Sequence, residues 1–172
     1  MPRVDTAFAE HPETAAAVRH TIGSAYASLG EVRKAAELHE RTWRDYQDIL
    51  GEDAPTTLRA RYDMVRDQLV EGDFGPAQEH VRALAESLEG GHEIEGVLPE
   101  VLDLIAAHLD VRGGDAEALE RGRQILDRAA ETLGEGDETV MEMRSMHLRM
   151  LIGARSLEAA ESLARRQLEL IE

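Results

Sequence analysis

Apolar residues along this chain recur at intervals of three and four, which is the spacing that places them on one face of an α-helix. In residues 31–49, for example, Ala35, Trp43 and Tyr46 fall on one side, whereas Arg41 falls on the other. No segment alternates apolar and polar residues over the length of a strand. The pattern therefore predicts an all-α chain. The expected helices cover about residues 11–28, 31–49, 55–70, 73–89, 97–111, 115–133, 137–152 and 156–171.

The helical pattern also repeats with a period close to 42 residues. Four stretches of seventeen residues, beginning at His20, Tyr62, Asp103 and Arg144, align without gaps. One aligned column, predicted to form the turn of each repeat, holds Gly30, Gly72, Gly113 and Ala154. A second column, predicted to pack between helices, holds Ala35, Ala77, Ala118 and Ala159. Each repeat is therefore expected to be a hairpin of an A helix, a turn where glycine can adopt a positive φ, and a B helix.

This periodicity predicts one continuous array instead of several unlike domains. The array is expected to cover residues 11–171, with residues 1–10 as an N-terminal extension. The four expected units are residues 11–52, 53–94, 95–135 and 136–171.

Composition and charge narrow the classes of partner. The chain has 172 residues, with 35 acidic against 19 basic ones and a formal net charge of −16. This charge repels phosphate backbones and anionic lipid surfaces, so neither nucleic acid nor a membrane is expected as a partner. No apolar run approaches the length of a membrane helix, and the N-terminus lacks the apolar stretch of a signal peptide. A cytoplasmic location is therefore expected.

The sequence offers little catalytic chemistry. Cysteine is absent, which removes disulfides, thiolate nucleophiles and cysteine-ligated zinc. The segment from His92 to Gly96 begins like a helical zinc motif but lacks its second histidine. No glycine-rich phosphate loop is present. We therefore expect no enzyme activity, no metal and no cofactor.

The repeat resembles the tetratricopeptide repeat (TPR) family, especially its 42-residue variety in kinesin light chains and bacterial signalling proteins. The first repeat carries the resemblance, with Ile22, Gly23, Tyr26, Gly30 and Ala35 at the family's packing and turn positions. In such repeats the small residues let the two helices approach closely. The resemblance implies a right-handed superhelix of about four hairpins, an α-solenoid, with a concave groove lined mainly by A helices. It also implies a scaffold that binds a protein or peptide, as a module of a signalling or regulatory protein.

The groove positions of the family can be transferred residue by residue to the A helices. The transfer selects His20, Ser24, Arg59, Tyr62, Arg66, Asp103, Arg144 and Leu148. Four of these residues, Arg59, Tyr62, Arg66 and Arg144, could make a basic interior suited to a carboxylate-bearing partner. The alternative is that the arginines pair within the chain, for which Asp63, Asp67 and Asp103 are available.

The last expected helix suggests a second function. Its apolar stripe continues through Leu157, Ala160, Ala164, Leu168 and Ile171, and no further repeat follows to cover it. Repeat arrays generally need polar ends, so this helix could mediate homo-oligomerisation or continue into a longer array. A small-ligand sensor is a third and less favoured interpretation.

Overall fold

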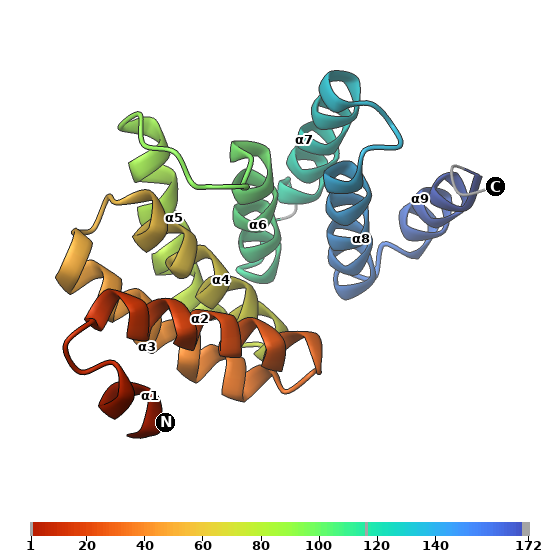
Figure 1. Cartoon of the computed structure of the whole chain (residues 1–172). Helices are drawn as coiled ribbons and strands as arrows, with labels where there is room; N and C mark the ends of the chain where they lie inside the picture. Colours follow the sequence, from red (N-terminus) through yellow and green to blue (C-terminus); the bar gives the residue numbers. More distant parts are fainter. Residues whose placement is uncertain (1, 116, 170–172) are drawn as a thin grey trace. The chain divides into compact units, whose positions relative to one another are not determined.

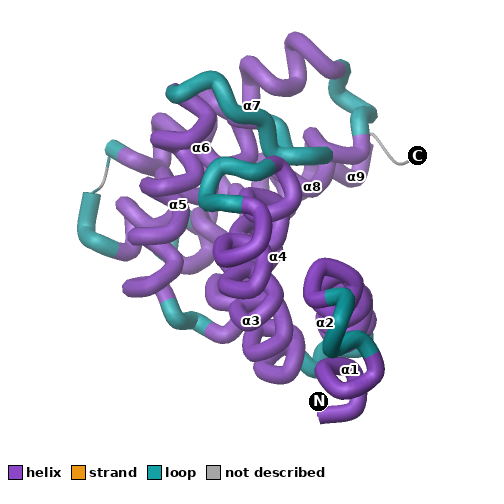
Figure 2. The backbone as a smooth tube through the Cα atoms, turned by 60° about the vertical axis from the view of Figure 1, so that its left-hand side comes forward, coloured by secondary structure: helices purple, strands orange, loops and turns teal. Residues whose placement is uncertain are grey.

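The computed structural model describes residues 2–115 and 117–169, and within them every regular element is an α-helix (Figures 1 and 2). The all-α fold expected from the sequence is thereby confirmed. The helices of the described part are α1 (Pro2–Ala7), α2 (Pro12–Ser28), α3 (Val32–Leu50), α4 (Pro55–Glu71), α5 (Phe74–Glu89), α6 (Pro99–Arg112), α7 (Ala118–Leu133), α8 (Glu138–Gly153) and α9 (Leu157–Glu169).

Helix α1 lies in the segment expected to be a plain extension. It spans six residues and contacts α2. A helix this short is invisible to hydrophobic periodicity, which needs a window of roughly 11–18 residues. The other helices of the described part correspond to the expected A and B helices, with α2, α4, α6 and α8 as the A helices.

The chain forms two compact units, Met1–Val97 and Leu98–Glu172. The first unit holds α1 to α5, with α2 and α3 side by side as one hairpin and α4 and α5 as the next (Figure 1). The second unit holds α6 to α9, in which α6 packs on α7, and α8 packs on both α7 and α9.

Helix beginnings follow simple chemistry. Three of the A helices start with a proline, Pro12, Pro55 or Pro99. Proline fits the first helical turn because an amide N–H at that position has no partner within the helix. The fourth A helix instead starts after Asp137, whose carboxylate accepts hydrogen bonds from the amides of Thr139 and Val140.

Each hairpin turn carries the same hydrogen bond, and this bond corrects the predicted register. In every turn an amide N–H reaches back five residues to a carbonyl oxygen, as in a Schellman motif. The residue just before each donor has a positive φ: Gly30 at 76°, Gly72 at 85°, Gly114 at 98° and Arg155 at 59°. The prediction of Gly113 and Ala154 as the third and fourth turn residues is therefore wrong by one position. Both adopt φ near the right-handed range, −74° and −82°, because each caps its A helix immediately before the turn.

The column of small packing residues needs the same correction in the last hairpin. Ala35, Ala77 and Ala118 are completely buried at the start of α3, α5 and α7. In α9 the buried alanine is Ala160, whereas Ala159 is exposed. In this hairpin the buried alanine follows the positive-φ residue Arg155 by five positions, the separation also seen between Gly30 and Ala35 and between Gly72 and Ala77.

Two glycines mark the closest helix contacts. A Cβ added at Gly23 of α2 would lie 2.7 Å from the imidazole of His39 on α3. A Cβ at Gly122 of α7 would lie 2.5 Å from the Met150 methyl and 3.0 Å from the His147 ring on α8. Gly23 thus fills the role that the family resemblance gives it, whereas Gly122 was not predicted. The neighbouring packing positions, Ile22 and Tyr26, are half-buried.

Replacing Gly23 with alanine should push the buried His39 ring out of place. We expect the free energy of unfolding to fall by about 1–3 kcal/mol, the usual cost of overpacking. Urea unfolding followed by circular dichroism measures this change. Gly75→Ala is the matched control, because Gly75 has no atom within 4 Å of its added Cβ, and it should leave stability unchanged or slightly raised. Equal stability of Gly23→Ala and the parent chain would contradict the packing argument.

Candidate interaction surface

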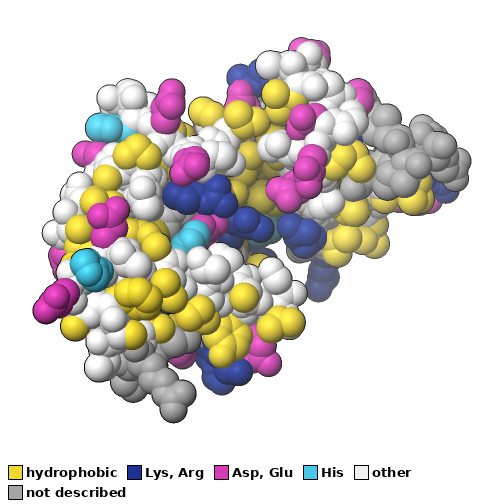
Figure 3. All heavy atoms as spheres, in the orientation of Figure 1, with side chains coloured by type: hydrophobic (Ala, Val, Ile, Leu, Met, Phe, Trp, Pro, Cys, Tyr) yellow, Lys and Arg dark blue, Asp and Glu magenta, His cyan; other side chains and the backbone are white. Residues whose placement is uncertain are grey.

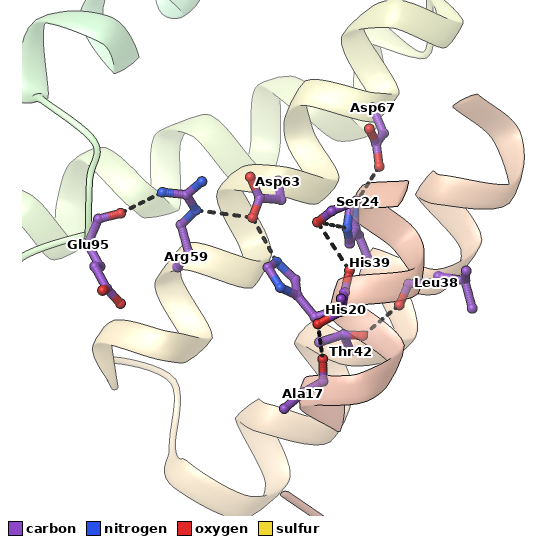
Figure 4. A network of polar contacts seen from close by, with 11 residues as sticks. Ala17, His20, Ser24, Leu38, His39, Thr42, Arg59, Asp63, Asp67 and Glu95 are labelled. Carbon is purple, nitrogen blue, oxygen red and sulfur yellow. Dashed lines mark hydrogen bonds and ion pairs between the residues drawn. The ribbon is translucent and has the colours of Figure 1, made fainter. Parts of the chain in front are cut away.

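A buried histidine joins three helices of the first unit. His39 of α3 is 2% exposed, and its Nδ1 lies 2.6 Å from the Asp67 Oδ2 on α4. Its Nε2 lies 3.4 Å from the Ser24 Oγ on α2 (Figure 4). Because Gly23 has no side chain, the imidazole can lie directly against α2. His39 therefore holds α2, α3 and α4 at a fixed spacing.

A second polar cluster lies beside it. His20 Nε2 is 2.8 Å from Asp63 Oδ2, and Arg59 Nε donates to the same oxygen at 3.1 Å. Arg59 also donates through Nη1 to the carbonyl oxygen of Glu95, at 2.7 Å (Figure 4). The His20 and His39 rings are 5.1 Å apart between centroids, so the two clusters are contiguous.

The Asp63 carboxylate is the electrostatic centre of this second cluster. Burial alone would raise its pKa, but hydrogen bonds from His20 and Arg59 and the positive charge of Arg59 outweigh burial. The pKa of Asp63 therefore lies below its ordinary value of 3.8, and the group is ionised at neutral pH.

Tyr62 of α4 lies between two arginines. The Arg59 and Arg66 guanidinium carbons lie 5.8 Å and 5.9 Å from the centre of its ring, within cation–π range. Arg59 is partly neutralised by Asp63. Arg66 is exposed, and among the described residues it has this ring contact but no ion pair. We call the surface formed by His20, Ser24, Arg59, Tyr62 and Arg66 the α2–α4 face.

The structure therefore brings five of the predicted groove residues together in the first unit. His20 and Arg59 are half-buried, Tyr62 is buried, and Ser24 and Arg66 are exposed. The other three, Asp103, Arg144 and Leu148, belong to the second unit. There Asp103 is exposed and Leu148 half-buried. The binding role of all eight stays a prediction.

Arg144 differs from the other predicted groove arginines because it is 2% exposed. Its guanidinium donates to the carbonyl oxygen of Glu135 at 2.6 Å and also pairs with the Glu135 carboxylate. These bonds tie α8 to the connection that precedes it. The alternative of pairing within the chain thus describes Arg144, which pairs with Glu135.

Arg61 of α4 is also buried, and no pattern in the sequence predicts this. Its side chain lies over the ring of Trp43, at 5.2 Å, and donates through Nε to His80 Nδ1 at 3.2 Å. Burial lowers the pKa of both Arg61 and His80, and the positive charge of Arg61 lowers that of His80 further. This contact joins α3, α4 and α5.

The pairing of His39 with Asp67 was also missed, although a partial signal exists. Asp63 and Asp67 lie four residues apart and so share one face of α4, and His39 lies within the apolar stripe of α3. Sequence reasoning considered both aspartates only as arginine partners. A histidine within an apolar stripe is better interpreted as a buried group that needs a carboxylate nearby.

Other classes of site find no support in the described part of the chain. Among those residues no group of three or more histidine, aspartate or glutamate side chains could hold a metal ion. None of the described helices has the length and apolar character needed to cross a membrane. The acidic side chains are scattered over the visible surface instead of gathering in one patch (Figure 3).

The lowered pKa of Asp63 predicts a pH-dependent contribution to stability. A depressed folded-state pKa stabilises the protein above the ordinary aspartate pKa, and this contribution is lost as pH falls through the folded-state value. Asp63→Asn should therefore lower the free energy of unfolding by about 1 kcal/mol at pH 7. Its difference from the parent chain should shrink below about pH 4. Urea unfolding of the variant and the parent chain at pH 7 and below about pH 4 tests this. Asp48→Asn, which changes an exposed aspartate, is the control. A difference that grows on acidification would contradict it.

Comparison with solved structures identifies the fold. The chain matches two crystal structures of nearly identical TPR-like repeats from a Podosopora anserina protein assigned as a kinesin light chain, one of a single-substitution variant and one without that substitution. The TM-scores are 0.64 and 0.60, respectively, with 19% sequence identity in both. Each match covers 91% of this chain and 74% of the other. No protein-family model and no curated protein matches the sequence. The chain therefore has the TPR-like helical-repeat fold that its first repeat resembles.

Proposed function

We propose that the chain is a non-catalytic scaffold that binds a protein or peptide on the α2–α4 face. Fold alone does not fix function, so the proposal is argued from the residues of this face. The observation that carries it is Arg66, an exposed guanidinium that lies on the Tyr62 ring without an ion pair among the described residues.

Arg66 is available for a partner in a way that its neighbours are not. Arg59 is bonded to Asp63 and Arg144 to Glu135, so their charges are already compensated. The Tyr62 ring restrains the Arg66 guanidinium, which reduces the entropy lost when it binds a carboxylate. A planar guanidinium can bind a carboxylate through two parallel hydrogen bonds.

The surroundings of Arg66 define the rest of the ligand. Val70, one helical turn further along α4, is 71% exposed. On α2 the exposed positions Thr21, Ser24 and Ser28, and the neighbouring Ala25, are all small and uncharged. A peptide with an acidic side chain for Arg66 and an apolar side chain for Val70 would match these two exposed positions of α4. We therefore propose that the partner is an acidic peptide that also carries apolar residues.

The wider context of the proposal rests on the family resemblance. Long TPR-like repeats of this kind occur in bacterial signalling and regulatory proteins, and we place the chain in that class. We also propose that the protein is cytoplasmic, as expected from its sequence. The net charge of −16 supports the further proposal that nucleic acid is not a partner.

Selection of a random peptide library on the immobilised protein tests the site. Selected peptides should be enriched in aspartate or glutamate next to an apolar residue. Arg66→Ala should weaken the binding of such a peptide at least about fivefold, equivalent to about 1 kcal/mol, in fluorescence anisotropy titrations. The control is Arg82→Ala, an exposed arginine of α5, which should change affinity less than about twofold. Equal effects of the two variants would place the binding site elsewhere.

A second candidate function, self-assembly through the last helix, is favoured by exposed leucines. Leu157 and Leu168 of α9 are 66% and 64% exposed, and their spacing of eleven residues places them on one helix face. Ile152, at the end of α8, is exposed as well. Within the stripe expected from the sequence only Ala160 is buried and Ala164 is half-buried, and Ile171 lies outside the described residues.

Sedimentation velocity across a range of concentrations tests this assembly. The parent chain should form a dimer or larger species, and Leu157→Gln combined with Leu168→Gln should return it to the monomer because the apolar contact is lost. Leu29→Gln, which changes a 76% exposed leucine of the first unit, should leave the assembly intact. A parent chain that stays monomeric at the highest concentration would exclude this function.

A further inference from the structure

Three side chains of the first unit lie in the order serine, histidine, aspartate (Figure 4). Ser24 Oγ is 3.4 Å from His39 Nε2, and His39 Nδ1 is 2.6 Å from Asp67 Oδ2. Each residue comes from a different helix, α2, α3 or α4. Ser24 is exposed, whereas His39 and Asp67 are buried.

The short contact with Asp67 orients the imidazole. A carboxylate can only accept hydrogen bonds, so the Nδ1 of His39 carries the hydrogen in this contact. In the neutral ring, Nε2 then presents its lone pair toward Ser24. The absence of a side chain at Gly23 lets the ring approach α2 this closely. Burial at 2% exposure keeps the ring in this orientation.

The Ser24 hydroxyl has two acceptors for its single hydrogen. One is the carbonyl oxygen of His20 at 3.1 Å, and the other is His39 Nε2. When the hydrogen points to Nε2, the Oγ lone pairs are free to attack an electrophile. Ser28, one turn further along the same exposed helix face, donates to the Ser24 carbonyl oxygen at 3.0 Å and has no histidine contact among the described residues. Ser28 thus has similar surroundings without a base.

We propose that Ser24 is a reactive nucleophile that becomes acylated by activated esters and thioesters, with His39 as its general base. Ser24 Oγ forms a bond to the carbonyl carbon while its proton moves to His39 Nε2. The bond from carbon to the leaving oxygen or sulfur then breaks, and that atom takes the proton from Nε2. The products are an ester on Ser24 and a free alcohol or thiol, and His39 is again neutral.

Helix geometry slows every step that passes through an oxyanion. Ser24 lies within α2, so its amide N–H is already engaged in a helical hydrogen bond. Such an amide cannot donate to the oxyanion that forms during attack or during hydrolysis of the ester, a loss of roughly 10²–10³ in rate. An activated ester or thioester can still acylate Ser24 because its leaving group is good, whereas the alkyl ester formed on Ser24 has a poor leaving group. The ester on Ser24 should therefore last. This inference does not depend on the proposed peptide binding, although Ser24 belongs to the same face.

Reaction of the whole protein with p-nitrophenyl acetate tests the proposal without any variant. Mass spectrometric peptide mapping over time gives the acetylation rates of Ser24 and Ser28 in the same molecule. General-base assistance should make Ser24 react about 100-fold faster than Ser28. Equal rates at the two serines, or no acetyl ester on Ser24, would overturn the inference.

Variants then identify the base. Ser24→Ala should abolish the fast acetylation, and His39→Ala should slow it to the rate of Ser28. Added imidazole should restore part of the rate in His39→Ala, which a purely structural histidine would not allow. Asp67→Glu, which keeps a carboxylate, should retain more of the rate than Asp67→Asn. Circular dichroism checks that each variant is folded, and failure of imidazole to rescue a folded His39→Ala would exclude His39 as the base.

Discussion

The contact of the His39 imidazole with three helices is the constraint on which the first unit depends. A buried ring needs both room and a hydrogen-bond partner, because an unpaired polar group in the interior is costly. Gly23 supplies the room and Asp67 the partner, from the helices on either side. The spacing that results brings His20 within reach of Asp63. It also places Ser24 beside the imidazole, so packing and chemistry share one cause.

Four arginines of the chain are used for bonds inside the molecule. The chain has only 19 basic residues against 35 acidic ones, so each basic residue used in this way leaves fewer for the surface. The buried or half-buried arginines that bond in this way are Arg19 with Asp45, Arg59 with Glu95, Arg61 with His80, and Arg144 with Glu135. Breaking such a bond leaves an uncompensated charge in the interior. Arg66, which lies on an aromatic ring instead, is therefore the more accessible cation of the α2–α4 face.

Much of the fold could be predicted from the sequence because its signals are local. Helical periodicity and the glycines Gly30 and Gly72 define helices and turns over stretches of a few residues. The register of the later turns could not be predicted, since a gapless alignment cannot detect a shift of one residue such as that between Gly113 and Gly114. The polar clusters of the candidate site were missed for another reason. The contact of His39 with Asp67 spans 28 residues and leaves no periodic trace.

The left-handed conformation of Arg155 has a consequence for anyone who wishes to extend such an array. A residue with a Cβ loses roughly 1–2 kcal/mol in adopting this conformation, whereas glycine adopts it freely. In a repeat protein each hairpin interacts only with its neighbours, so a cost in one turn is not shared by the rest. A designer who duplicates hairpins from this chain should therefore copy the segment around Gly30, because every copy of the Arg155 turn would add the same penalty again.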